Sequence, residues 1–355
     1  MADKKGISLL RPKRDEDKNV VRLFFVFIGV FILMSVLKPQ LFLQKGNFIS
    51  MATQFPEYGI MAIGISLAMI SGGIDLAVVG TANLSAIFAA KYLIAAAPRG
   101  TPPEQALGAI GIAVVLALAV GLAAGAFNGF LIAWLKIPAI LATLGTQQLF
   151  TGFAIVVTEG KPLSRLPLLY SQIGNAELFG FLPVPFMLYV ILAVSTGLLL
   201  SKTSFGLRLY FTGTNPKAAV FAGIENKLIL LRTYMLSGLL SSTAGLIMMA
   251  RANSAKADYG AAYTLQCVLI AVLGGVDPNG GFGTIRGLTL AVLILQFLSS
   301  GLNMFEHISN FYRDIIWGGV LILALIVNWA IAKRNEKRIV SRNSPAGLEK
   351  ASGSS

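Results

Sequence analysis

The residues best able to do chemistry in this chain lie where apolar sequence would otherwise continue unbroken. The segment Ser71–Leu76, which reads Ser-Gly-Gly-Ile-Asp-Leu, interrupts an apolar stretch that runs from residue 48 to residue 97. A carboxylate and a glycine pair are unfavourable in hydrocarbon, and ionisable groups inside membrane segments usually belong to transport or binding sites. The segment therefore predicts a membrane protein whose helices break at a functional turn.

Two roles are open for Asp75 in this turn. It could contact a transported solute, or its carboxylate could cap the N–H groups of the next helix, where the helix dipole also favours negative charge. We favour the structural role, and we extend it to a second glycine-aspartate break at residues 274–277. The residues assigned to structural turns are Gly72, Gly73, Asp75, Gly274, Gly275 and Asp277.

A polar solute crossing an apolar pore needs amide and carboxylate partners. The candidate pathway residues are Gln54, Glu57, Asn128, Gln147 and Gln148. Asn128 could instead form a hydrogen bond between helices as part of their packing. Gln147 and Gln148 are adjacent, so they point about 100° apart on a helix and at most one of them faces a pore.

Composition supports a helical membrane protein. Hydrophobic residues make up 55% of the 355 residues and charged residues only 13%, about half the charged share of a soluble domain. The apolar blocks are near 20 residues long and lack strand-like alternation, which predicts an all-α fold and excludes an outer-membrane barrel. The net charge of +13 comes from basic residues at helix ends and tails, so we expect a lipid bilayer and no nucleic acid as partner.

Several chemistries are excluded by what the sequence lacks. One cysteine, Cys267, and one histidine, His307, leave no disulfide framework and no metal site. The chain has no G-x-x-x-x-G-K-[ST] phosphate-binding motif, so it is not expected to hydrolyse ATP or to be an enzyme. We expect no cofactor in this chain.

Ten transmembrane spans are predicted between a basic tail at 1–20 and a C-terminal tail at 332–355, so that the membrane domain covers residues 21–331. The spans are 21–37, 48–70, 77–97, 107–134, 137–158, 183–200, 227–250, 259–274, 284–303 and 312–331. The eighth has only 16 residues and could be tilted, re-entrant or shielded by protein. With the N-terminus inside, 20 of the 29 Lys and Arg residues lie on the inner side, which predicts that both termini are cytoplasmic.

A weak internal symmetry relates the two halves of the chain. Gly125 and Asn128 in the fourth span resemble Gly301 and Asn303 in the ninth, and an offset of five spans predicts a five-plus-five inverted repeat. A parallel relation between the two glycine-aspartate breaks is the alternative. Gly121, Gly125 and Gly129 recur every four residues and predict close packing of the fourth span against another helix.

The longest inner loop, residues 201–226, contains the pattern of a short capped helix. Asn215 suits an N-cap, Pro216 suits the first helical position, and Gly223 suits the end. A helix of two turns is unstable alone in water, so it needs a partner surface. A capped connector between two spans, without a docking role, is the alternative.

Five motifs together resemble the ribose/xylose/galactose-type permeases of bacterial ABC importers. They are the Ser71–Leu76 signature, Thr143-Leu144-Gly145, the 213–224 loop with Asn215-Pro216, Leu273-Gly274-Gly275 with Gly280-Gly281-x-Gly283, and Gly301-x-Asn303. The resemblance covers residues 45–331. The sequence departs from the family pattern after Leu76, where Ala77 replaces a hydroxyl residue and the glycine comes one position late, at Gly80. It departs again at Asp277, where a Ser or Thr is common.

The resemblance implies a permease subunit in the bacterial inner membrane that imports a small polar solute, most simply a monosaccharide. It implies three partners: a second permease subunit, identical or homologous, a cytoplasmic ABC ATPase and an extracytoplasmic solute-binding protein. It also implies that the short helix docks into the ATPase through residues among Asn215, Pro216, Lys217, Ala218, Ala219 and Gly223. A nucleoside or autoinducer-2 importer is the alternative within the family.

Two rival classes remain open outside the family. An ion-coupled secondary transporter also has broken helices and inverted repeats, but it works without an ATPase. A purely structural membrane subunit would show no solute flux.

Overall fold

The computed structural model describes residues 13–305 and, beyond them, only residues 315, 318, 319, 322 and 326. The described residues up to 305 form one compact unit, and the described residues from 315 on belong to a second unit. The tenth predicted span, residues 312–331, lies outside the described residues except for those five positions. The C-terminal tail at 332–355 lies outside them entirely.

The described part of the chain is mostly helical, as its composition predicts. The longer helices are α1 (Lys13–Leu37), α3 (Lys45–Ile70), α4 (Val78–Ala96), α5 (Pro103–Ala133), α6 (Ala139–Thr158), α8 (Val184–Lys202), α11 (Asn226–Ala252) and α13 (Ile285–Leu302). The shorter helices are α2 (Pro39–Phe42), α7 (Leu168–Gly174), α9 (Ser204–Thr214), α10 (Pro216–Phe221) and α12 (Tyr263–Leu273). Each of the first nine predicted spans coincides with one helix. Seven of the helices in the described part of the chain are long and apolar enough to cross a membrane: α1, α4, α5, α6, α8, α11 and α13.

Prolines explain where several helices begin. Pro102, Pro138, Pro167 and Pro183 each occupy the position directly before a helix, in an extended conformation, at the starts of α5, α6, α7 and α8. The proline ring fixes φ and disfavours the helical conformation in the residue before it, so the helix cannot extend backwards. The boundaries between these helices are therefore encoded locally.

Two predicted spans depart from a simple crossing helix. Helix α12 has 11 residues and is about 16 Å long, roughly half the hydrocarbon thickness. It packs against α3 and α13 and buries Gln266, Cys267 and Leu269. This placement agrees with the alternative in which the eighth predicted span is shielded by protein. Helix α3 is 26 residues long but carries Gln54, Pro56 and Glu57, which lower its hydropathy.

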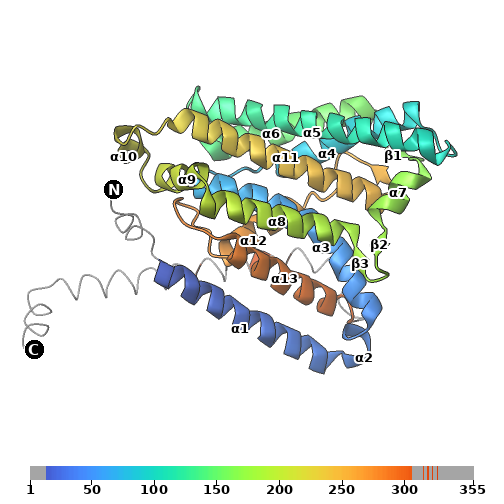
Figure 1. Ribbon diagram of the computed structural model, residues 1–355, viewed down its shortest axis with the longest axis horizontal. Helices are drawn as coiled ribbons and strands as arrows, with labels where there is room; N and C mark the ends of the chain where they lie inside the picture. Colours follow the sequence, from blue (N-terminus) through green and yellow to red (C-terminus); the bar gives the residue numbers. More distant parts are fainter. Residues whose placement is uncertain (1–12, 306–314, 316–317, 320–321, 323–325, 327–355) are drawn as a thin grey trace, which may run out of the picture. The chain divides into compact units, whose positions relative to one another are not determined.

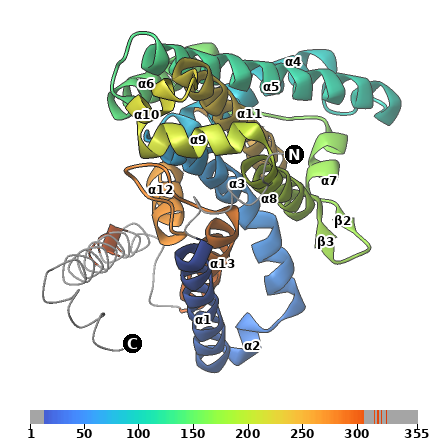
Figure 2. The same ribbon diagram turned by 60° about the vertical axis from the view of Figure 1, so that its left-hand side comes forward.

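Helix α3 lies at the centre of the bundle, where α8, α11, α12 and α13 pack around it (Figure 1). Every residue of α3 from Phe55 to Ile70 is buried. Helices α4, α5 and α6 pack together on one side with α11, and α1 lies against α13 on another side (Figure 2). The polar residues of α3 are therefore held in the interior of the protein.

Four strands of two residues each lie in the connections at the end of the bundle opposite α10 (Figure 1). Strand β1 (Leu163–Ser164) pairs antiparallel with β4 (Ser254–Ala255), with Leu163 opposite Ala255. Strands β2 (Glu177–Leu178) and β3 (Leu182–Pro183) form a hairpin, with Glu177 opposite Pro183. The first pair ties the connection after α6 to the connection after α11.

Candidate functional site

The short capped helix predicted in the longest inner loop is confirmed as α10. The Oδ1 atom of Asn215 accepts a hydrogen bond from the Ala218 N–H at 3.0 Å, Pro216 is the first helical residue, and Gly223 adopts a φ of +77° just after the end. Within α10 only Ala219 is buried, so Lys217 and Ala218 lie on the surface. The helix therefore presents most of its residues to the outside of the protein.

Two features of this loop were not predicted. Helix α9 precedes α10, and its N-cap Thr203 accepts a hydrogen bond from the Gly206 N–H at 3.4 Å. Asn226 then fixes α10 to its neighbours, because its amide donates to the Pro216 carbonyl at 2.8 Å and its Oδ1 accepts from the Thr212 hydroxyl at 3.1 Å. Helix α10 is thereby held against the start of α11.

The last turn of α9 touches both glycine-aspartate turns through backbone atoms. A Cβ atom at Gly213 would collide with the Ile70 carbonyl oxygen and lie 2.6 Å from the Gly281 nitrogen. The Gly281 N–H donates to the same Ile70 oxygen at 2.9 Å, and a Cβ at Gly280 would lie 2.8 Å from the Gly72 Cα. In the segments 70–72, 213–214 and 280–281, which we call the glycine junction, a Cβ added at Gly213, Gly280 or Gly281 would lie within 3 Å of atoms of another segment. A displacement of α9 and α10 must therefore act directly on both turns.

Asp75 is buried in the first turn and joins it to α11. Its Oδ1 accepts from the Ala77 N–H at 3.0 Å, and its Oδ2 accepts from the Ser237 hydroxyl at 2.7 Å. The prediction that Asp75 caps the N–H groups of helix α4 is wrong, because the N–H that it accepts from belongs to Ala77, the residue before the first helical residue Val78. The oxygen that reaches into the first turn of α4 comes from Gln147, which accepts from the Gly80 N–H at 2.7 Å.

The second turn repeats the local bonding of the first. The Oδ1 of Asp277 accepts from the Asn279 N–H, two residues on, at 2.9 Å, as Asp75 accepts from Ala77. Gly72 and Gly275 both adopt a positive φ, +89° and +84°, whereas Gly73 and Gly274 do not. Asp277 is only half-buried and has no counterpart of the Asp75–Ser237 bond in the described part of the chain. The two aspartates thus share a turn type and differ in their tertiary contacts.

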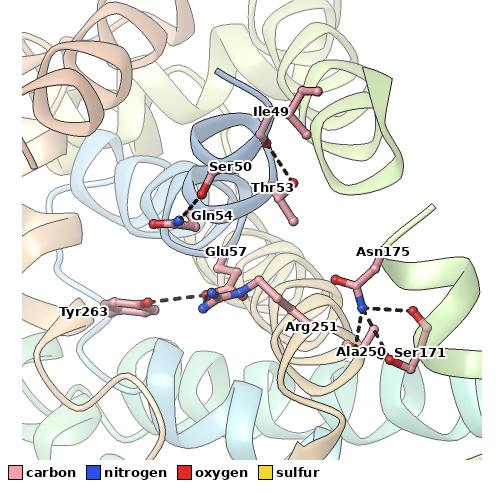
Figure 3. A network of polar contacts seen from close by, with 10 residues as sticks. All are labelled: Ile49, Ser50, Thr53, Gln54, Glu57, Ser171, Asn175, Ala250, Arg251 and Tyr263. Atoms are coloured by element: carbon pink, nitrogen blue, oxygen red, sulfur yellow. Dashed lines mark hydrogen bonds and ion pairs between the residues drawn. The ribbon is translucent and has the colours of Figure 1, made fainter. Parts of the chain in front are cut away.

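Glu57 is fully buried in α3 and is bound by residues from two other helices (Figure 3). The Arg251 Nε donates to Oε1, the Arg251 Nη2 donates to Oε2 at 3.0 Å, and the Tyr263 hydroxyl donates to Oε2 at 3.3 Å. The Arg251 side chain is 36% exposed. One turn away on α3, the amide of Gln54 donates to the Ser50 hydroxyl at 2.7 Å. The carboxylate therefore joins α3 to the end of α11 and the start of α12.

The other three candidate pathway residues lie apart from Glu57 and differ from one another. Asn128 is buried in α5, and its Oδ1 has no hydrogen-bond partner within the described structure. Gln147 is half-buried and bonded to Gly80, whereas Gln148 is exposed on α6. The two adjacent glutamines therefore differ in their surroundings, and whether either of them faces a pore stays a prediction. Their roles in transport stay predictions.

The glycine repeat in the fourth span marks a close helix contact, as predicted. A Cβ at Gly121 would lie 2.5 Å from the Gly238 carbonyl oxygen, one at Gly129 would lie 2.9 Å from the Leu231 Cα, and one at Gly125 would collide with the Tyr234 carbonyl oxygen. The partner is α11, which supplies Gly238 to the same contact. We call this contact the α5–α11 seam.

Four residues whose side chains form hydrogen bonds between separate segments of the site were not predicted from the sequence. They are Arg251, Tyr263, Ser237 and Asn83. Asn83 is buried in α4, and its amide donates to the carbonyls of Ala257 and Tyr259 at 3.0 and 2.8 Å. The pairing of Arg251 with Glu57 could have been predicted from the sequence. A cation in the last turn of an apolar span needs an anionic partner, and Glu57 is a lone acid in the middle of another span. The described residues contain no group of three or more His, Cys, Asp or Glu side chains that could hold a metal ion.

Comparison with known proteins agrees with this architecture. The family described as "Branched-chain amino acid transport system / permease component" matches residues 47–325. The ribose import permease protein RbsC of Bacillus subtilis is 34% identical over 320 residues, which cover 89% of this chain and 95% of that protein. The autoinducer 2 import system permease protein LsrC of Photorhabdus luminescens is 28% identical over 331 residues, 93% of this chain and 96% of that one.

A solved inward-facing metal-chelate type ABC transporter has a similar fold, with a TM-score of 0.50 and 14% sequence identity over 88% of this chain and 99% of that one. At that identity the likeness concerns the fold alone. The family match covers most of the chain, and it includes the glycine junction, both aspartate turns and helix α10. The chain therefore belongs to this permease family of ABC importers.

Proposed function

We propose that the chain is the membrane-spanning subunit of an ATP-driven importer for a monosaccharide. An extracytoplasmic binding protein delivers the solute, and a separate cytoplasmic ATPase supplies the energy. The observation that carries the proposal is the exposed helix α10, whose connection to α9 touches both aspartate turns in the glycine junction. This arrangement gives an ATPase docked at α10 a direct mechanical contact with the helices that flank the turns. The similarity to a ribose import permease supports a sugar as cargo.

The proposal includes a topology. Two permease subunits, identical or homologous, sit in the inner membrane of a bacterium, each with ten spans in a five-plus-five inverted repeat. The domain at 21–331 lies between the tails at 1–20 and 332–355, and both termini are cytoplasmic. The excess of Lys and Arg on the side of α10 supports this orientation.

We assign the solute pathway to Gln54, Glu57, Asn128, Gln147 and Gln148, with the hydrogen-bond network around Glu57 shaping one part of it. Docking of the ATPase falls to Asn215, Pro216, Lys217, Ala218, Ala219 and Gly223. The turns at Gly72, Gly73, Asp75, Gly274, Gly275 and Asp277 are assigned a structural role. In this scheme the chain makes and breaks no covalent bond and needs no cofactor or metal.

The proposal is tested by uptake of labelled ribose into proteoliposomes that hold this chain, its ATPase and its binding protein. Uptake should require internal ATP and should stop when either partner is left out. Uptake without the ATPase would instead identify an ion-coupled secondary transporter. The chain would instead be a structural subunit if the complex hydrolyses ATP normally but transports none of the solutes that its binding protein binds.

A second cargo, autoinducer-2, is favoured by the similarity to a permease that imports it. The ligand that co-purifies with the companion binding protein separates the two cargoes, because that protein sets most of the selectivity. Ribose or another aldose would support the first proposal, and autoinducer-2 would support the second.

A further inference from the structure

The hairpin Glu177–Pro183 has an unusual residue at its tip. Three residues, Phe179, Gly180 and Phe181, connect the paired positions Leu178 and Leu182, and the first two have φ angles of +57° and +72°, as in a type I′ turn. Such turns favour Asn-Gly, because a bulky side chain is strained at positive φ. Phe179 is nevertheless present, and it is 85% exposed, so its ring is barely covered by the described part of the chain.

Phe179 is part of a continuous apolar tip. Phe181 is 56% exposed, Leu178 is also exposed, and no charged residue lies between Leu178 and Leu182. The charged Glu177 lies at the base of the hairpin. An aromatic tip of this kind has no stabilising role in water, so its partner must be apolar.

The position of the hairpin indicates that this partner is lipid. Helix α8 begins directly after Pro183 and is one of the candidate membrane spans. Its exposed residues Leu188, Ile191, Val194 and Leu198 are spaced three or four apart, so they form one outward face. Figure 1 shows the hairpin running across the direction of α8 beside its first turn, at the end of the bundle opposite α10. The tip therefore lies in the connection that leads directly into a candidate membrane span, where a membrane boundary is expected.

We propose that the hairpin Glu177–Pro183 is an interfacial anchor that inserts Phe179 and Phe181 into the boundary between lipid headgroups and acyl chains. Phenylalanine, tryptophan and leucine form the apolar face of interfacial segments, which is buried about 5–10 Å into this boundary. The anchor fixes the depth of α7 and α8 in the bilayer. It also accounts for the strained Phe179, since asparagine would form a better turn but would not insert.

Tryptophan fluorescence tests the proposal in the full chain, reconstituted into vesicles with its ATPase. The three native tryptophans are first replaced by phenylalanine, and Phe179→Trp is introduced. Phe221→Trp is the matched control, because Phe221 is 92% exposed on α10, outside any predicted span.

We expect lipids brominated near the headgroup to quench the tryptophan at position 179 at least twofold, and iodide in the buffer to leave it almost unchanged. The tryptophan at position 221 should show the opposite pattern in vesicles prepared without the ATPase and with iodide on both sides of the membrane. Iodide quenching at position 179 without quenching by bromolipid would overturn the proposal. Protection from iodide at 179 that appears only when the binding protein is added would assign the tip to a protein partner instead.

A second variant separates the anchor from the fold of the hairpin. Phe179→Asn suits the turn, so its melting temperature in detergent should equal or exceed that of the wild type. Its gain in melting temperature on transfer from detergent to vesicles should be smaller than that of the wild type. An equal gain in both proteins would contradict an anchoring role.

Discussion

Substituting Gly213 by alanine tests whether the glycine junction transmits motion from α10. The added methyl group would collide with the Ile70 carbonyl oxygen and lie 2.6 Å from the Gly281 nitrogen. Both contacts are with backbone, so no side chain can rotate away to make room. The two segments must separate, and the hydrogen bond from Gly281 to Ile70 then breaks.

The cost of the substitution follows from these contacts. Overpacking a tight site costs about 1–3 kcal/mol. Leaving a buried donor or acceptor without its partner costs about 1–3 kcal/mol more. A total of roughly 2–6 kcal/mol falls on the contact between α9 and the two turns. Helix α10 keeps its own cap at Asn215, so binding of the ATPase should be retained.

The assay compares ATP-dependent uptake, stimulation of ATP hydrolysis by the liganded binding protein, and co-purification of the ATPase. We expect uptake and stimulation to fall at least tenfold, since a loss of about 1.4 kcal/mol in coupling already changes a rate tenfold. Co-purification should be unchanged. Gly111→Ala is the matched control, because Gly111 lies inside helix α5 with no atom within 4 Å of an added Cβ. Wild-type uptake by the Gly213→Ala complex would refute the junction as the transmitting contact.

Three further predictions concern the residues around the site. Breaking the Glu57–Arg251 pair should destabilise the complex by about 3–5 kcal/mol. Arg251→Gln should lower the melting temperature more than Glu57→Gln, because it leaves a fully buried carboxylate without its partner, whereas Arg251 is partly hydrated. Equal melting temperatures of the two variants would contradict this. Asp75→Asn should keep much of the uptake, whereas Asp75→Leu should lose assembled complex because the bonds to Ala77 and Ser237 disappear; a Leu variant that assembles normally but does not transport would argue for a solute contact. Asn215→Ala should cost about 1 kcal/mol of helix capping and weaken binding of the ATPase in a pull-down titration, and an unchanged affinity would speak against α10 as the docking element.

Much of the fold could be predicted because its signals are local. Blocks of apolar residues and the prolines before α5, α6 and α8 mark helix boundaries directly. The cap at Asn215 and the glycine repeat of α5 also act over a few residues, so they could be read without knowing the fold.

The contacts within the site could not be predicted in the same way. The Glu57–Arg251 pair joins residues 194 positions apart, and the Asp75–Ser237 bond joins residues 162 positions apart. Whether Gln147 turns toward Gly80 depends on how α6 packs against α4, which no local pattern records. The glycine junction needs three segments to converge, and no local pattern indicates that residues 70–72, 213–214 and 280–281 meet.

The α5–α11 seam has a consequence for how the chain is made. Gly125 and Gly238 are 113 residues apart, and at a synthesis rate of roughly 5–20 residues per second α11 follows α5 by on the order of 10 s. During that time the surface of α5 formed by Gly121, Gly125 and Gly129 faces lipid or whichever helix is nearest. A cell that slows translation between these two helices lengthens this exposure, and we expect it to produce more wrongly paired, proteolysed permease.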